Sequence, residues 1–88
     1  MAMYFKRYWD EDREDEFGNW GKSVWFFEVE KSGFISKQIE KYKNGKILKY
    51  DQQNKEDEFG MLGDQQLDVS EFLDFEISKE EFEIVWDD

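Results

Sequence analysis

The amino-acid sequence predicts an α+β fold: a curved antiparallel sheet of about four strands, with a short C-terminal helix packed on one face. Three patterns lead to this expectation. Apolar and acidic side chains separate onto two faces over residues 24–30, Asn44-Gly45 divides two strand-like segments, and Ser78 with Glu81 precedes an apolar stripe. The 88 residues suffice for one modest core, so residues 1–88 are expected to form a single domain.

The first half of the chain holds two strand candidates joined by a long loop. Residues 3–9 are rich in aromatic side chains, a composition typical of a strand. Residues 10–21 contain an acidic run and two glycines, which favour a loop. The second candidate, residues 24–30, places its apolar members on one face and its acids on the other, with Trp25, Phe27 and Val29 opposed to Glu28 and Glu30.

Residues 34–43 and 46–50 are expected to pair around Asn44-Gly45, a dipeptide favoured in two-residue type I′ hairpins because both central residues need positive φ. Pairing outward from such a turn sets Tyr42 opposite Ile47 and Glu40 opposite Lys49, which predicts an ion pair. A helix over residues 35–42 is the alternative, because its apolar residues also fit helical spacing. The short strand-like segment after the turn favours the hairpin.

The C-terminal third is predicted to run from a loop into a helix. Residues 51–66 are polar, with Met61 and Leu62 as candidates for core contacts, and residues 70–77 fit either a helical turn or an edge strand. Ser78 and Glu81 form a capping box that begins a helix. The helix then carries a one-sided apolar stripe of Phe82, Val85 and Trp86.

Charge is distributed in blocks. The net charge is −11, and residues 51–88 hold fourteen acids against two lysines, whereas residues 1–50 hold ten basic and nine acidic side chains. A negative field of this size repels nucleic acid and anionic membranes and steers basic proteins inward. The expected partner is therefore a basic protein, with no direct nucleic-acid or membrane binding, and the chain is expected to be a monomer or a weak dimer. A purely solubilising charge is the alternative.

Composition also limits the chemistry. The chain has no Cys and no His, which excludes disulfides, thiol nucleophiles and the commonest general base. We therefore expect no enzymatic activity, no cofactor and no metal. The acids Asp10, Asp12 and Glu14 alternate as in a calcium loop, but Asp15 stands where an EF-hand needs glycine. No apolar run approaches the roughly 20 residues of a membrane span, so a cytoplasmic protein is expected. Met1-Ala2 is expected to be a cloning addition.

The motif E-D-E-F-G occurs twice, at residues 14–18 and 56–60. Each copy would present paired acids beside an aromatic side chain and a flexible glycine, and Trp20 lies next to the first copy as a candidate interface anchor. As an alternative to a contact surface, the two motifs are solvated turns, each anchored by its Phe. As an alternative to an interface anchor, Trp20 folds over the sheet edge. The repeat itself is interpreted as coincidence rather than duplication. The predicted partner-binding residues are Asp10, Asp12, Glu14, Asp15, Glu16, Trp20, Glu56, Asp57 and Glu58.

Several segments resemble those of a family of small bacterial proteins known only as a domain of unknown function. The resemblance covers most of the chain and is most specific at the ending F-E-I-S-K-E-E-F-E, residues 75–83, closed by Trp86. It implies a single α+β domain with no catalytic residues to assign. Many such proteins resemble small immunity proteins that neutralise toxins, but the acidic loop before residue 21 departs from the family pattern.

Charge, composition and resemblance together predict an acidic non-enzymatic binding protein, of which an immunity-type toxin inhibitor is the favoured kind. Two alternatives stay open at this point. One is a nucleic-acid mimic that occupies the groove of a nuclease or defence protein, with carboxylates in place of phosphates. The other is a hydrolase that works through a pair of carboxylates.

Overall fold

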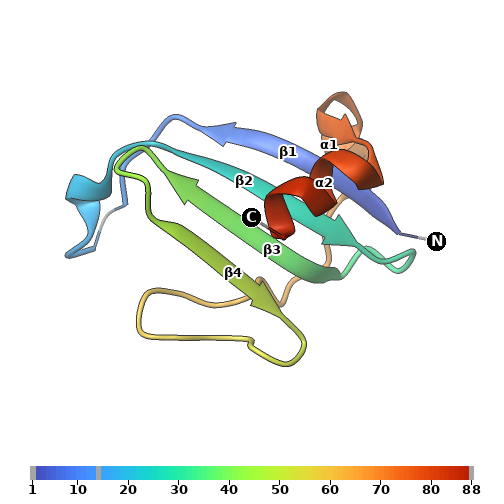
Figure 1. Cartoon of the computed structure of the whole chain (residues 1–88). Coiled ribbons are helices and arrows are strands. Elements are labelled where there is room, and N and C mark those ends of the chain that lie inside the picture. Colours follow the sequence, from blue (N-terminus) through green and yellow to red (C-terminus); the bar gives the residue numbers. More distant parts are fainter. Residues whose placement is uncertain (1, 14, 88) are drawn as a thin grey trace.

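In the computed structural model, which describes residues 2–13 and 15–87, five strands form one antiparallel sheet in the order β4-β3-β2-β1-β5. Figure 1 labels the first four of these strands. The strands are β1 (Met3–Trp9), β2 (Ser23–Val29), β3 (Ile35–Tyr42), β4 (Ile47–Asp51) and β5 (Glu76–Ile77). The helices are α1 (Val69–Phe72) and α2 (Lys79–Trp86), with 3₁₀ turns η1 (Gly18–Trp20) and η2 (Leu73–Phe75).

The predicted α+β class, with an antiparallel sheet and a C-terminal helix, is confirmed. The sheet has one strand more than the four expected, because the undecided stretch 70–77 forms both a helical turn and the edge strand β5. The sequence predictions for Met1 and Glu14 fall outside the described residues.

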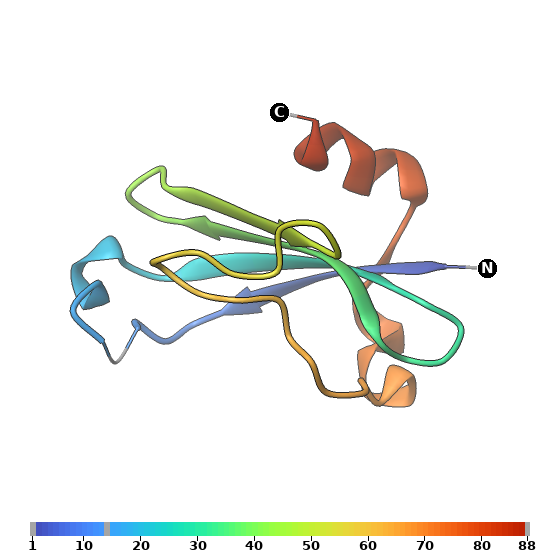
Figure 2. The ribbon, with the colours of Figure 1, turned by 90° about the horizontal axis from the view of Figure 1, so that it is seen from below.

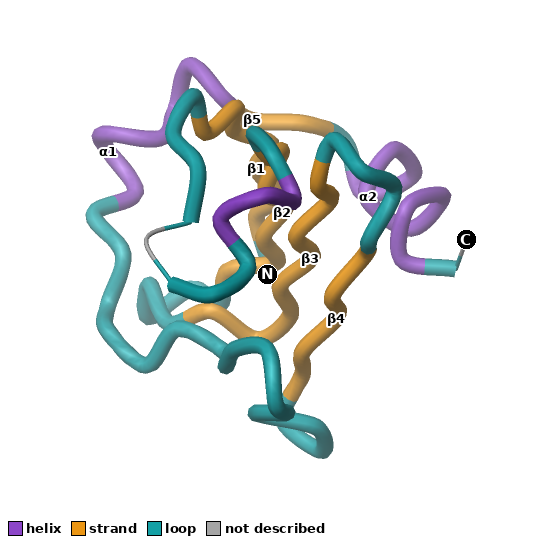
Figure 3. Tube along the Cα trace, turned by 90° about the vertical axis from the view of Figure 1, so that its left-hand side faces the viewer, coloured by secondary structure: helices purple, strands orange, loops and turns teal. Residues whose placement is uncertain are grey.

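Helix α2 covers one face of the sheet because its apolar stripe meets apolar side chains of the strands. Phe82, 1% exposed, packs in a buried cluster with Phe26 of β2 and Ile39 of β3. The predicted helix start after Ser78 is confirmed, and the Ser78 hydroxyl accepts a hydrogen bond from the backbone N–H of Glu81 at 3.1 Å, which is one of the two bonds of a capping box. Figure 3 shows α1 and α2 on opposite sides of the sheet.

The segment after β4 and helix α1 cover the opposite face, which Figure 2 shows on the other side of the strands from α2. Phe72 of α1 packs against Phe5 and Phe27, with ring centroids 5.8 and 6.2 Å away. Leu62 is buried in the same cluster, so its predicted core contact is confirmed, whereas Met61 is 53% exposed. The core is therefore divided into two layers by the sheet.

The β3–β4 hairpin closes through a three-residue turn, so the predicted two-residue turn is wrong. The backbone N–H of Tyr42 donates to the carbonyl of Lys46 at 2.9 Å, and the N–H of Gly45 donates to the carbonyl of Tyr42 at 2.9 Å. Gly45 has a φ of 94°, while Asn44 has no positive φ and so does not fit a type I′ turn. A three-residue loop with glycine in the left-handed region is the next most common hairpin connection.

The additional turn residue shifts the predicted strand pairing by one position. Glu40 pairs with Leu48, and Lys49 pairs with Ile39, so the predicted ion pair between Glu40 and Lys49 is wrong. A shift of one residue moves side chains to opposite faces of the sheet. Glu40 therefore lies buried under the segment after β4, while the Lys49 ammonium lies on the α2 side and donates to the carbonyl of Trp86 at 2.7 Å.

Candidate functional site

The two D-E-F-G segments adopt the same local turn. Asp15 accepts a hydrogen bond from the backbone N–H of Phe17 at 2.9 Å, and Asp57 accepts one from the N–H of Phe59 at 2.8 Å. An Asp side chain that binds its own backbone two residues later is a common way to close a short turn. Each turn fixes the direction of its Phe and leaves the intervening Glu exposed. We call residues 15–18 and 56–60 the paired acidic turns.

The paired acidic turns meet in space although they lie far apart in the sequence. The rings of Phe17 and Phe59 are 5.1 Å apart in an edge-to-face arrangement. Trp20 packs against both rings, at 4.9 and 5.3 Å, and against Tyr42 of β3 at 5.1 Å. These four residues, Phe17, Trp20, Tyr42 and Phe59, form the ring cluster. It attaches both turns to one end of the sheet.

Arg13 ties the two turns together. Its guanidinium lies 5.2 Å from the ring centroids of Phe17 and Trp20, which places a cation over aromatic faces. The Nε of the same group donates to the Asp15 carboxylate at 3.0 Å, and its Nη2 donates to the backbone carbonyl of Phe59. One side chain thus binds an acid of the first turn and the backbone of the second.

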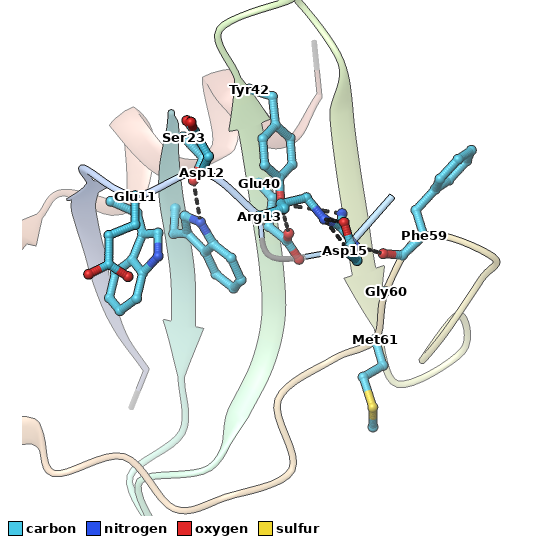
Figure 4. Close-up of a pocket in the computed structure, with 12 residues that line it drawn as sticks. Glu11, Asp12, Arg13, Asp15, Ser23, Glu40, Tyr42, Phe59, Gly60 and Met61 are labelled. Atoms are coloured by element: carbon cyan, nitrogen blue, oxygen red, sulfur yellow. Dashed lines mark hydrogen bonds and ion pairs between the residues drawn. The ribbon is translucent and has the colours of Figure 1, made fainter. Parts of the chain in front are cut away.

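A hollow of about 560 Å³ lies between the loop after β1, the ring cluster and the sheet, and Glu40 lines it (Figure 4). Glu40 is only 4% exposed. One carboxylate oxygen accepts a hydrogen bond from the Tyr42 hydroxyl at 2.6 Å, and the other accepts one from Gln38 at 2.8 Å. Arg13 donates to the Tyr42 hydroxyl at 3.5 Å, so this hydroxyl connects the guanidinium to the buried acid.

Burial raises the pKa of the Glu40 carboxyl above its ordinary value, although the hydrogen bonds from Tyr42 and Gln38 favour the charged form. Because the pKa is higher in the folded than in the unfolded chain, the folded protein binds this proton more tightly. The contribution of Glu40 to stability is therefore full below its unfolded-state pKa and is lost as the pH rises through its folded-state pKa.

Asp57 is shifted in the opposite direction. Burial acts to raise its pKa, but hydrogen bonds from the N–H of Phe59, the Tyr50 hydroxyl and the N–H of Gly60 outweigh burial and lower the pKa. The stability that Asp57 contributes is present above its unfolded-state pKa and is lost as the pH falls through its folded-state value.

We expect a pH titration followed by carboxyl ¹³C NMR to show Asp57 with a midpoint below about 3.9 and Glu40 with a midpoint above about 4.3, the ordinary values for these side chains. The same resonances measured in the urea-unfolded chain supply the reference. A Glu40 midpoint at or below its unfolded-state value would contradict the expectation that burial outweighs the hydrogen bonds from Tyr42 and Gln38.

The structure brings most of the predicted partner-binding residues to one end of the molecule. The exposed acids of the paired acidic turns lie there, namely Asp15, Glu16, Glu56, Asp57 and Glu58. Asp12 lines the hollow, and Asp10 forms an exposed ion pair with Lys22 at 2.7 Å. Trp20 is half-buried within the ring cluster, so it fits the alternative of a ring folded over the sheet end rather than an exposed anchor.

Sequence reasoning missed two members of this site, Arg13 and Glu40. Arg13 is the one basic residue in an acidic run, and that isolation was the available signal. The sequence predicts an ion pair of Glu40 with Lys49 because the predicted turn is one residue shorter than the observed turn. In the observed register, Leu48 rather than Lys49 lies opposite Glu40, so the predicted ion pair is replaced by a buried acid.

Comparison with known protein families, curated proteins and solved structures finds no match to this chain. The family resemblance and the function inferred from the sequence therefore stay predictions. In the part of the chain that the structure describes, no helix is long and apolar enough to cross a membrane. Within those same residues, no group of three or more acidic side chains is placed to hold a metal ion.

Proposed function

We propose that the protein is a small non-enzymatic binding protein whose paired acidic turns engage a basic protein. The observation that carries this proposal is the convergence of the turns, because the contact of Phe17 with Phe59 gathers two separate acidic segments on one surface. The favoured kind of partner is a toxin that the protein inhibits in the manner of an immunity protein.

The charges of the paired acidic turns support a basic partner. Glu16, Glu56 and Glu58 are exposed and form no ion pair with a described residue. Their negative field is therefore compensated mainly by solvent ions, which a basic partner would displace. Such a surface raises association rates and makes binding sensitive to salt.

The packing beneath these acids supports binding as well. Arg13 and the ring cluster hold both turns in place, so the acidic side chains project from a backbone that is already ordered. A preordered surface loses less conformational entropy when it binds than a mobile loop does.

The proposal is tested by capture of basic proteins at low salt with three forms of the chain. Glu16→Gln combined with Glu58→Gln removes two charges from the paired acidic turns. Glu30→Gln combined with Glu76→Gln removes two charges from exposed positions elsewhere and serves as the control. We expect the parent and the control to retain a basic protein that the turn variant loses. Equal capture by all three forms, or capture of no basic protein, contradicts the proposal.

The captured protein also decides between the kinds of partner. A toxin is expected to stop growth when expressed alone and to become harmless when co-expressed with this chain. If the captured protein is instead a nuclease, and nucleic acid displaces this chain from it, this chain is a nucleic-acid mimic.

A further inference from the structure

We infer that the hollow beside the paired acidic turns receives one arginine side chain of the basic partner. This inference rests on the proposed function and adds to it the chemical group that is recognised. The hollow of about 560 Å³ is within the size range of small-ligand pockets. It is lined by aromatic and carboxylate groups, among them Trp9, Trp25, Phe59, Glu11, Asp12 and Glu40.

Glu40 gives the hollow a buried negative charge without a direct cationic partner in the described structure. Its two oxygens accept hydrogen bonds from Tyr42 and Gln38, which are both uncharged donors. Arg13 reaches the Tyr42 hydroxyl rather than the carboxylate itself. Buried charges in proteins are normally paired, because taking an ion out of water is costly. The Arg13 charge favours the ionised form of Glu40 only from beyond the Tyr42 hydroxyl, and a cation that enters the hollow would add a closer positive charge.

The walls of the hollow suit a flat cation. Trp9 is 45% exposed although the Arg7 guanidinium lies 5.7 Å from its ring centroid, and the ring centroids of Trp9 and Trp25 are 6.5 Å apart. The Trp25 indole is held in place by a hydrogen bond of 2.8 Å from its Nε1 to the Ser23 hydroxyl, so this ring is oriented before any ligand arrives. Indole faces attract cations, and a guanidinium stacks on them better than a lysine ammonium does.

The chain already binds a guanidinium in this way in the wall of the hollow itself. Arg13 lies over the rings of Phe17 and Trp20 and pairs with the carboxylate of Asp15. The part of the lining away from Arg13 offers the same combination, with the rings of Trp9 and Trp25 beside the carboxylates of Glu11 and Asp12. Among the residues that line the hollow, four are acids and one is basic, which favours a cationic ligand over an anionic or neutral one.

The test uses N-acetyl-arginine methylamide as the probe, with the corresponding lysine and citrulline derivatives as comparisons. Citrulline has nearly the shape of arginine but no charge. Binding is followed by NMR through the indole N–H signals of Trp9 and Trp25. We expect the arginine probe to shift both signals saturably, the lysine probe to bind more weakly, and the citrulline probe to have no effect. Equal shifts with arginine and citrulline, or no saturable shift, overturn the inference.

Matched variants locate the binding. Trp9→Ala is expected to lower the affinity for the arginine probe about fivefold. Tyr8→Ala is the control, because Tyr8 is the neighbouring residue, is 73% exposed and points to the other face of β1. The Tyr8→Ala variant is expected to bind the arginine probe as tightly as the parent does. Glu40→Gln is expected to weaken binding further. If that variant does not fold, Trp9→Ala and the citrulline probe decide the question, and equal effects of the Trp9 and Tyr8 variants overturn the inference.

The inference and the proposed function fail in different ways. If Trp9→Ala captures the basic partner as well as the parent does while the Glu16/Glu58 variant loses it, the acidic surface stands and the arginine pocket is wrong. If the arginine probe binds with the expected selectivity but no basic protein is captured, the pocket stands and the proposed function is wrong.

Discussion

Replacing Phe82 by alanine is expected to lower the free energy of unfolding by about 3–5 kcal/mol. Phe82 is the residue through which α2 is anchored, because its buried ring packs on Phe26 and Ile39 and lies 5.2 Å from the ring of Tyr4. Alanine would leave a cavity between helix and sheet that neither element can close. Urea unfolding followed by circular dichroism measures the loss.

The matched control is Trp86→Ala on the same stripe of α2. Trp86 is half-buried, and it stacks on the outer side of Phe82 at 6.2 Å with the Lys37 ammonium 4.9 Å from its ring. Its removal opens no enclosed cavity, so the expected loss is about 1–2 kcal/mol. Equal losses for the two variants would show that the helix is anchored along its whole stripe rather than at Phe82.

Replacing Trp20 by alanine is expected to cost about 2–4 kcal/mol, because this ring contacts the other three members of the ring cluster and the Arg13 guanidinium. Trp9→Ala, at an exposed position, is expected to cost about 1 kcal/mol or less. Urea unfolding of both variants compares the two losses.

Acrylamide quenching gives an independent measure of exposure for the same two side chains. In variants that retain a single tryptophan, Trp9 is expected to be quenched more strongly than Trp20. A Trp20 that is quenched as strongly as Trp9, and whose removal costs no stability, would return it to the role of an exposed interface anchor.

The elements with local signals were predictable from the sequence. The start of α2 at Ser78 follows from the capping pattern, and β2 follows from the alternation of residues 24–30, because both signals lie within a few neighbouring positions. The hairpin was predictable in kind but not in register. Asn44-Gly45 fits both a two-residue and a three-residue turn, and the difference decides whether Lys49 or Leu48 lies opposite Glu40.

The site itself depends on contacts between distant segments. The sequence identified both acidic turns as candidates, but it held no signal that Phe17 would meet Phe59 or that Trp20 would lie between them. These contacts depend on where the segment after β4 returns across the sheet. Periodicity and turn preferences carry no information about that path, because they describe only neighbouring residues.

The hydrogen bond from Arg13 to the carbonyl of Phe59 spans 46 residues, whereas the pairs β1–β2, β2–β3 and β3–β4 each join consecutive strands. Links of long sequence separation carry a larger loop-closure entropy and form after the local pairings that shorten the intervening loop. We therefore expect the joining of the two turns to be a late step in folding. Reversing that step opens the acidic end while the sheet ladder stays intact, so this end can unfold locally at a lower free-energy cost than the whole domain.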